Sequence, residues 1–123
     1  MSDSHFEATV RRRTGTAIID LRGEADAFAE EALSAAYTEA TREDPPAVLL
    51  NFREVDYINS TGIALIVALL AQARKSRRKV LACGLSDHYQ EIFQITRLAD
   101  FMSIFPDEES AMADAPASAG ADR

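Results

Sequence analysis

The chain has 123 residues and a formal net charge of −7, from 20 acidic and 13 basic side chains; 47% of its residues are apolar and 27% are charged. This length fits one domain, and this balance is typical of a folded globular protein rather than a disordered one. The acidity argues against a nucleic-acid binder, which needs a basic face for the phosphates. The single cysteine, Cys83, excludes a disulfide within one chain, and its apolar neighbours predict a small buried side chain.

Neither an export signal nor a membrane helix is apparent in the sequence. Residues 1–5 lack the charged-then-apolar order of a signal peptide. The longest apolar run, residues 63–71, is far shorter than the roughly 20 residues that a membrane helix needs. We therefore expect a cytoplasmic protein without a membrane span.

The first part of the chain predicts a hairpin followed by a helix. Residues 6–13 and 16–21 are rich in β-formers and flank Thr14-Gly15, a pattern typical of two strands joined by a tight turn. Asp26 is the expected N-cap of a helix over residues 27–41. The apolar face of this helix is expected to consist of Phe28, Ala32, Leu33, Ala36 and Ala40.

The middle of the chain predicts a buried strand and an apolar helix. Residues 47–52 are apolar without alternation, which is typical of a central strand covered on both faces. A loop is expected over residues 53–58, followed by a helix over residues 59–76. Its segment 63–71 is apolar all round, and such a helix needs cover on both sides. The sheet would cover one side, which leaves the other for a partner or for a second copy in a homodimer.

The last third continues the alternation of strand and helix. We expect a strand over residues 79–83, a helix over 87–96 with Tyr89, Ile92 and Phe93 as its apolar contacts, a strand over 101–105, and a further helix beginning near 106–109. Residues 113–123 have no large apolar side chain and predict a disordered tail after a domain of residues 1–112. The whole order predicts an α/β fold, with a mixed, mostly parallel sheet of about five strands flanked by about four helices.

The sequence lacks the residue patterns of catalysis and of cofactor binding. His5 and His88 lie far apart without a cysteine cluster, so no metal site of the usual zinc spacing is expected. The glycines are scattered, without the fingerprint of a dinucleotide site or a Walker loop. The acidic pair Glu108-Glu109, like Glu30-Glu31, is interpreted as solvated helix surface. We therefore expect neither an enzyme nor a bound cofactor.

One local pattern carries more information: Asn59-Ser60-Thr61-Gly62 stands between a strand and an apolar helix. The first amides of a helix lack internal acceptors and carry partial positive charge, so an anion there is stabilised. The fold could tolerate a phosphate on Ser60, which would add about −1.5 to −2 charges to a surface that a partner contacts. Ordinary capping by Asn, Ser and Thr is the simpler interpretation of the same residues. Gly62 weakens a helix and would allow another backbone to approach closely.

Together these segments resemble the STAS domains of small bacterial anti-sigma factor antagonists. The matching elements are Gly23-Glu24-Ala25-Asp26 after the second strand, Val48-Leu49-Leu50-Asn51-Phe52 in the apolar strand, and Tyr57-Ile58-Asn59-Ser60-Thr61-Gly62 at the helix start, while Phe93, Leu98, Phe101 and Phe105 suit the family's ending. The resemblance covers residues 6–112 and implies the STAS fold.

The resemblance also implies a phosphorylation switch on Ser60, with Thr61 as the second choice of acceptor. Unphosphorylated, such a protein binds an anti-sigma factor serine kinase of the histidine-kinase-like ATPase type and so frees the sigma factor. Phosphorylation ends the binding, and a PP2C-type phosphatase restores it; the nucleotide belongs to the kinase. The expected partner-binding residues are Asp26, Asn59, Ser60, Thr61, Gly62, Ile63 and Leu65. Asn59 departs from the family pattern, which usually has aspartate at this place.

Two alternatives to this switch remain open at the level of sequence. One is a STAS interaction module without a switch, such as a subunit of a sensory scaffold or a transporter-associated protein, in which Ser60 and Thr61 only cap the helix and contact a partner. The other is a small-ligand or enzymatic domain with a pocket lined by Cys83, His88 and Tyr89. For these three residues, a buried strand followed by a helix start is the simpler explanation.

Overall fold

Strands and helices alternate along this protein, whose computed structural model describes residues 5–115. The elements in chain order are β1 (Phe6–Arg13), β2 (Thr16–Ala25), the 3-10 helix η1 (Ala27–Ala29), α1 (Glu30–Ala40), β3 (Ala47–Ile58), α2 (Ser60–Lys75), β4 (Lys79–Cys83), α3 (Asp87–Ile95), the 3-10 helix η2 (Leu98–Asp100), β5 (Ser103–Phe105) and α4 (Glu108–Asp114). The predicted α/β order is confirmed.

The strands form one 5-stranded sheet in the order β1-β2-β3-β4-β5. β1 and β2 pair antiparallel through the predicted tight turn, in which Gly15 has a φ of 73° that glycine adopts without strain. The remaining pairs are parallel, and the connections between them contain the helices. The sheet is therefore mixed and mostly parallel, as the sequence predicts.

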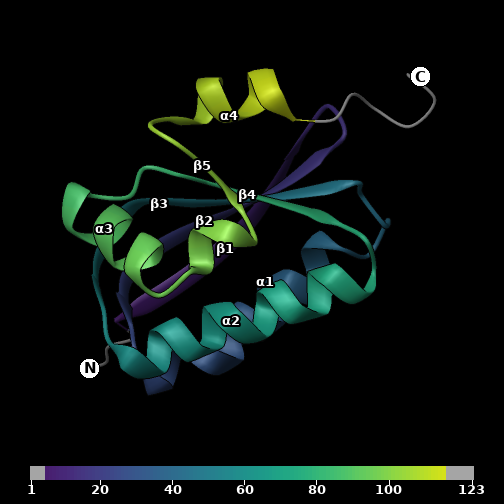
Figure 1. Ribbon diagram of the computed structural model, residues 1–123. Helices are drawn as coiled ribbons and strands as arrows, with labels where there is room; N and C mark the ends of the chain where they lie inside the picture. Colours follow the sequence, from purple (N-terminus) through teal and green to yellow (C-terminus); the bar gives the residue numbers. More distant parts are fainter. Residues whose placement is uncertain (1–4, 116–123) are drawn as a thin grey trace.

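Helices cover the two faces of the sheet unequally. Figure 1 shows α1 and α2 side by side on one face and the short α4 on the opposite face. The first face carries the larger core, because alternate strand residues such as Ile19 and Leu50 point into it, together with Tyr89 and Phe93 of α3. The residues between them, such as Ile18, point to a smaller cluster beneath α4. This two-sided burial explains why the central strands read as continuous apolar runs.

The structure corrects several predicted boundaries. β3 continues to Ile58, so the loop expected over residues 53–58 is strand, because it pairs with the end of β2 as far as Ala25 opposite Ile58. Most side chains of this extension are exposed and show no clean apolar alternation. α4 runs to Asp114, beyond the predicted start of the tail at residue 113, and residues 116–123 lie outside the described part.

The helix predicted over residues 27–41 also differs in its first turn. It opens as η1, capped by Asp26, and becomes α-helical only at Glu30. Because of this geometry Phe28 points outward and is 81% exposed, so its assignment to the apolar face is wrong. Leu33 and the other predicted face residues of α1 do pack on the sheet. Cys83 is buried as predicted, and burial raises the pKa of its thiol to about 11, which makes it a poor nucleophile.

Candidate functional site

The ends of β2 and β3 meet beside the start of α2. Ala25 and Ile58 are paired at the carboxyl ends of these parallel strands, and the amide of Asn59 donates to the Ala25 carbonyl at 3.1 Å. Ligand sites of open α/β sheets lie at this end of the strands. Asp26 and Asn59, which are far apart in sequence, therefore belong to one region of the surface.

Asn59 caps α2. Its backbone is extended, with φ −96° and ψ −175°, and its Oδ1 accepts a hydrogen bond from the Gly62 amide at 2.9 Å. Its carbonyl accepts the amide of Ile63, also at 2.9 Å. This satisfies one of the helix's unpaired amides and leaves the first amides, those of Ser60 and Thr61, without an acceptor inside the helix.

Gly62 lets the end of β2 lie against the first turn of α2. A Cβ added at this position would overlap the carbonyl oxygen of Ala25, a backbone atom that cannot move aside. The predicted close approach of another backbone is therefore present, and the neighbouring chain is β2. The contact fixes the start of α2 relative to the loop that contains Asp26.

Ser60 and Thr61 are both exposed in the first turn of α2. Neither is the N-cap, because Asn59 fills that place, and Gly62 makes the close contact with β2. The hydroxyl of Ser60 is thus available at the positive end of a helix of 16 residues. Such a position suits a phosphoryl group or another anion.

Asp26 orders the neighbouring loop. Its Oδ1 accepts the amide of Phe28 at 2.9 Å, and its Oδ2 lies 3.3 Å from Nε2 of His5. The His5 ring meets the Phe28 ring edge to face, with centroids 5.8 Å apart. These contacts hold an exposed aromatic ring on η1, an element that contacts α2. The helical spacing of the apolar residues predicted that Phe28 is buried and so hid its exposed position. Its place two residues after the capping Asp26 was the one sequence signal that the first turn differs from the rest of the helix.

The outer face of α2 extends this surface. Ile63 and Leu65 are half-buried, and Val67 is 47% exposed. Leu65 also lines a shallow hollow of about 130 Å³ between α1 and α2. The sheet and α1 therefore cover only part of this apolar helix within the described residues. The structure brings together Asp26, Asn59, Ser60, Thr61, Gly62, Ile63 and Leu65 along the start of α2 and the adjoining loop.

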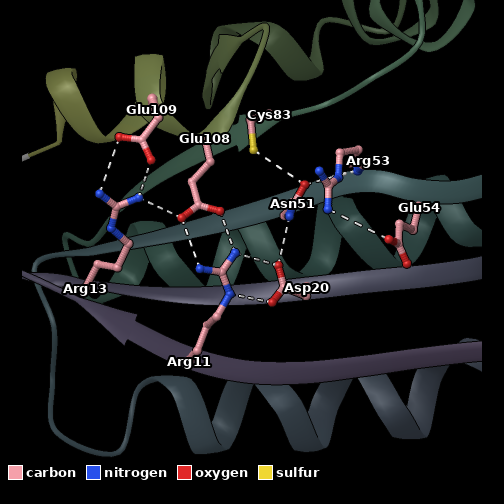
Figure 2. Close-up of polar contacts among 9 residues, drawn as sticks. All are labelled: Arg11, Arg13, Asp20, Asn51, Arg53, Glu54, Cys83, Glu108 and Glu109. Atoms are coloured by element: carbon pink, nitrogen blue, oxygen red, sulfur yellow. Dashed lines mark hydrogen bonds and ion pairs between the residues drawn. The ribbon is translucent and has the colours of Figure 1, made fainter.

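A second polar cluster lies on the opposite face of the sheet. Figure 2 shows Glu108 and Glu109 of α4 turned toward Arg11 and Arg13 of β1. Arg11 donates to Asp20 at 2.6 Å and also to Glu108. The bonds that Glu108 accepts from Arg11 and, to a smaller extent, from Arg13 lower its pKa to about 2. The same arginine holds the pKa of Asp20 below its usual value.

This cluster corrects the interpretation of Glu108 as solvated surface, because Glu108 anchors α4 through Arg11 and Arg13. Glu109 is 79% exposed, as that interpretation expects. The cluster borders a hollow of about 750 Å³. Within the described residues its main charges pair with one another, Arg11 with Asp20 and Arg22 with Glu7 and Glu54. We interpret this face as structural.

The pocket considered for Cys83, His88 and Tyr89 does not form as a polar site. The Cys83 sulfur contacts Asn51 Oδ1 at 3.6 Å on the face beneath α4. The Tyr89 hydroxyl instead accepts the amide of Ile58 at 2.9 Å, and its ring is buried in the larger core. Among residues 5–115, no group of three or more His, Cys, Asp or Glu side chains could hold a metal ion. No helix in the same part of the chain is long and apolar enough to cross a bilayer.

The fold is thus an α/β domain with a mixed 5-stranded sheet, in which an apolar helix capped by Asn59 begins beside the end of β2. The family model described as "STAS domain" matches residues 7–111, so this chain belongs to the STAS domain family. The resemblance noted from the sequence is thereby confirmed.

Two curated relatives support this placement. BtrV of Bordetella bronchiseptica, whose name describes it as an anti-sigma factor antagonist, is 29% identical over 112 residues that span 91% of this chain and 94% of BtrV. The anti-sigma-B factor antagonist of Staphylococcus aureus is 27% identical over 86 residues, which are 70% of this chain and 80% of that protein.

Among solved structures, the anti-sigma factor antagonist SpoIIAA in its unphosphorylated form matches with a TM-score of 0.66 and 19% identity, over 89% of this chain and 94% of SpoIIAA. The Bacillus SpoIIAA in its phosphorylated form matches with a TM-score of 0.65 and 22% identity, over 88% of this chain and 96% of that one. At these identities the likeness shows the fold.

Proposed function

We propose that this chain is an anti-sigma factor antagonist whose binding to an anti-sigma factor serine kinase ends when Ser60 is phosphorylated. One observation carries the proposal. Ser60 is exposed at the start of α2, while its neighbours Asn59 and Gly62 serve the cap and the close contact with β2. The names of the curated relatives support the same role.

The proposed docking face consists of Asp26, Phe28, Asn59, Ser60, Thr61, Gly62, Ile63 and Leu65. It combines an exposed aromatic ring, a half-buried aliphatic stripe and two exposed hydroxyls. Aromatic anchors surrounded by polar groups are typical of the centres of protein interfaces. A kinase that covers this face would bring Ser60 into contact with its own surface.

Phosphorylation would change this face without unfolding the domain. A phosphate on Ser60 would lie at the positive end of α2, where the first amides can donate to it. It would add about −1.5 to −2 charges to a surface that buries apolar groups when the partner binds. The desolvation of that charge would oppose binding, and removal by a PP2C-type phosphatase would restore it.

Mass spectrometry tests this proposal. The full chain is incubated with ATP and each candidate anti-sigma kinase of its own genome, and its intact mass is measured before peptide mapping. One added phosphate, lost in Ser60→Ala and kept in Thr61→Ala, is the expected result. A kinase that binds stably but transfers no phosphate to Ser60 would contradict the switch.

A STAS interaction module without a switch is the second candidate, and Asn59 favours it. Its side chain caps α2 but is neutral, so any contribution of an aspartate at this place to kinase recognition is missing. Asn59→Asp should keep the cap, because both residues cap helices equally well. If phosphorylation appears only in Asn59→Asp, the native protein is the unswitched module.

A further inference from the structure

A basic groove lies at the far end of α2 from Ser60. It is a hollow of about 560 Å³ between the last turns of α2, the start of β4 and the segment from η2 to β5. We call it the basic groove and define it by Arg74, Arg77, Lys79, Val80, Phe101 and Met102. Arg74 comes fourteen residues after Ser60, which at about 1.5 Å per residue is roughly 21 Å along the helix. A ligand in the groove would therefore leave the docking face accessible.

The groove has an apolar floor and an exposed aromatic side. Val80 and Met102 are buried at 4% and 6% exposure, whereas Phe101 is 53% exposed. The guanidinium carbon of Arg74 lies 5.6 Å from the centroid of the Phe101 ring. This cation–π contact holds a charged group and an apolar surface side by side. Such a pair suits a ligand that has both an acidic group and an apolar group.

Two cations of the groove have no acidic partner in the described part of the chain. Lys79 pairs with Asp114 at 3.1 Å, and the buried Arg78 pairs with Asp44 and donates to the Pro45 carbonyl. The side chains of Arg74 and Arg77 are exposed and form no salt bridge or hydrogen bond with residues 5–115. Arg74 lies in the last turn of α2, where any cation is favoured by the helix dipole, so its position has a structural explanation.

Arg77 lies at the same end of α2, where the helix dipole also favours a cation, but its backbone conformation is unfavourable for arginine. Its φ is 57°, in the left-handed region, and it follows the C-cap Ser76. The amide of Arg78 donates to the Ala73 carbonyl at 2.9 Å, which completes a helix ending that glycine usually occupies. Arginine here has a conformational cost that glycine would avoid, and no ion pair within the described chain offsets it. Asp44 and Arg97 share this left-handed conformation, but each of them forms an ion pair, with Arg78 and Asp100 respectively.

The charge distribution indicates the kind of ligand. The groove lining contains four basic residues and one acid, a local charge of +3, in a chain of −7, so the rest of the chain carries −10. A long polyanion such as a nucleic acid would extend over this acidic remainder and be repelled. We propose that the basic groove binds a short acidic segment of a partner protein, with carboxylates against Arg74 and Arg77 and an apolar side chain against Phe101.

Fluorescence anisotropy tests this assignment with a defined probe. The probe is a labelled peptide with the central sequence Glu-Glu-Leu-Phe-Glu-Glu, and its control has glutamine in place of each glutamate. The acidic peptide should bind more tightly, and added salt should weaken it. Arg77→Gly and Arg74→Gln should each weaken binding about tenfold or more, as the loss of close interfacial charge pairs does.

Arg77→Gly tests peptide binding without destabilising the fold. Glycine adopts a φ of 57° more easily than arginine, so the variant should not have a lower melting temperature. Arg53→Gln is the matched control: it removes one exposed arginine from β3, outside the groove, and should leave binding unchanged.

Equal binding of the acidic and glutamine peptides, or no binding up to about 1 mM, would overturn the proposal. Tighter binding of a single-stranded oligonucleotide or of anionic vesicles would overturn the peptide assignment. Kinase binding at the docking face should be unaffected by Arg77→Gly, so the two proposals fail independently.

Discussion

Adjacent residues at the start of α2 have separate tasks. Asn59 caps the helix, Gly62 admits the end of β2, and Ser60 between them makes neither contact. Because the cap and the close contact do not depend on Ser60, its hydroxyl can be modified without loss of the fold. The same reasoning predicts that these neighbours differ sharply in their tolerance of mutation.

Gly62→Ala should lower the free energy of unfolding by about 2 kcal/mol, because the added methyl group would overlap the Ala25 carbonyl oxygen and force the backbone to shift. Urea denaturation followed by circular dichroism measures the change. Thr61→Ala, at the exposed neighbouring position, should stay within about 0.5 kcal/mol of wild type. Equal stability of Gly62→Ala and wild type would mean that β2 does not press against α2.

Phe28→Ser should weaken kinase binding about tenfold or more while leaving the free energy of unfolding within about 0.5 kcal/mol of wild type, because its ring is 81% exposed. Phe101→Ser is the control, since it removes another exposed ring at the far end of α2. Isothermal titration with the kinase compares the two variants. If both lose affinity equally, Phe28 is not a specific part of the docking face.

At the scale of elements, α4 depends on charge pairing to stay on the sheet. It has 7 residues, too few to be stable as an isolated helix, and it buries Ala111 against the strands. The bonds from Arg11 and Arg13 to Glu108 join α4 to the amino-terminal hairpin. These bonds therefore connect β1, near one end of the described chain, with α4 at the other end.

Glu108→Gln should lower stability at neutral pH by about 1 kcal/mol, because it removes the charge that Arg11 and Arg13 hold. The folded pKa of Glu108, about 2, lies below its ordinary value of 4.5. Its contribution is therefore complete above pH 4.5 and is lost as the pH falls toward 2. The difference from wild type should shrink over that range in urea titrations. Glu109→Gln is the control: because the Glu109 side chain is 79% exposed, this change should alter the free energy of unfolding little. A difference between Glu108→Gln and wild type that does not depend on pH would contradict this account.

Sequence reasoning recovered the elements because their signals are local: the hairpin turn at Gly15, the cap at Asn59 and the apolar run of β3 up to Phe52. It missed the extension of β3, since those residues are strand only through their partners in β2. It missed the role of Glu108 for a related reason, because its arginine partners are 95 and 97 residues away. For the site, the motif identified the start of α2, whereas Phe28 became visible only from the 3-10 geometry of η1.

At the scale of the whole molecule, α2 links two surfaces of opposite character. Its start presents the docking face, with exposed hydroxyls and an aromatic ring, and its end presents the basic groove. Figure 1 shows α2 as a long helix on one face of the sheet, and residues at both of its ends, such as Ser60 and Arg74, are exposed. If both proposals hold, a domain of this size contacts two partners at once, and only one of the contacts is sensitive to Ser60.

The central claim is tested most directly by isothermal titration calorimetry with the proposed anti-sigma factor kinase, which compares the affinity of full-length Ser60→Asp with that of wild type. Ser76→Asp, which places the same charge at an exposed serine at the other end of α2, is the control. We predict that Ser60→Asp loses about 3 kcal/mol or more of binding free energy, over a hundredfold in affinity, because an unpaired charge would be buried in the interface. Ser76→Asp should bind like wild type. Equal affinity of Ser60→Asp and wild type, with both variants folded, would contradict the account.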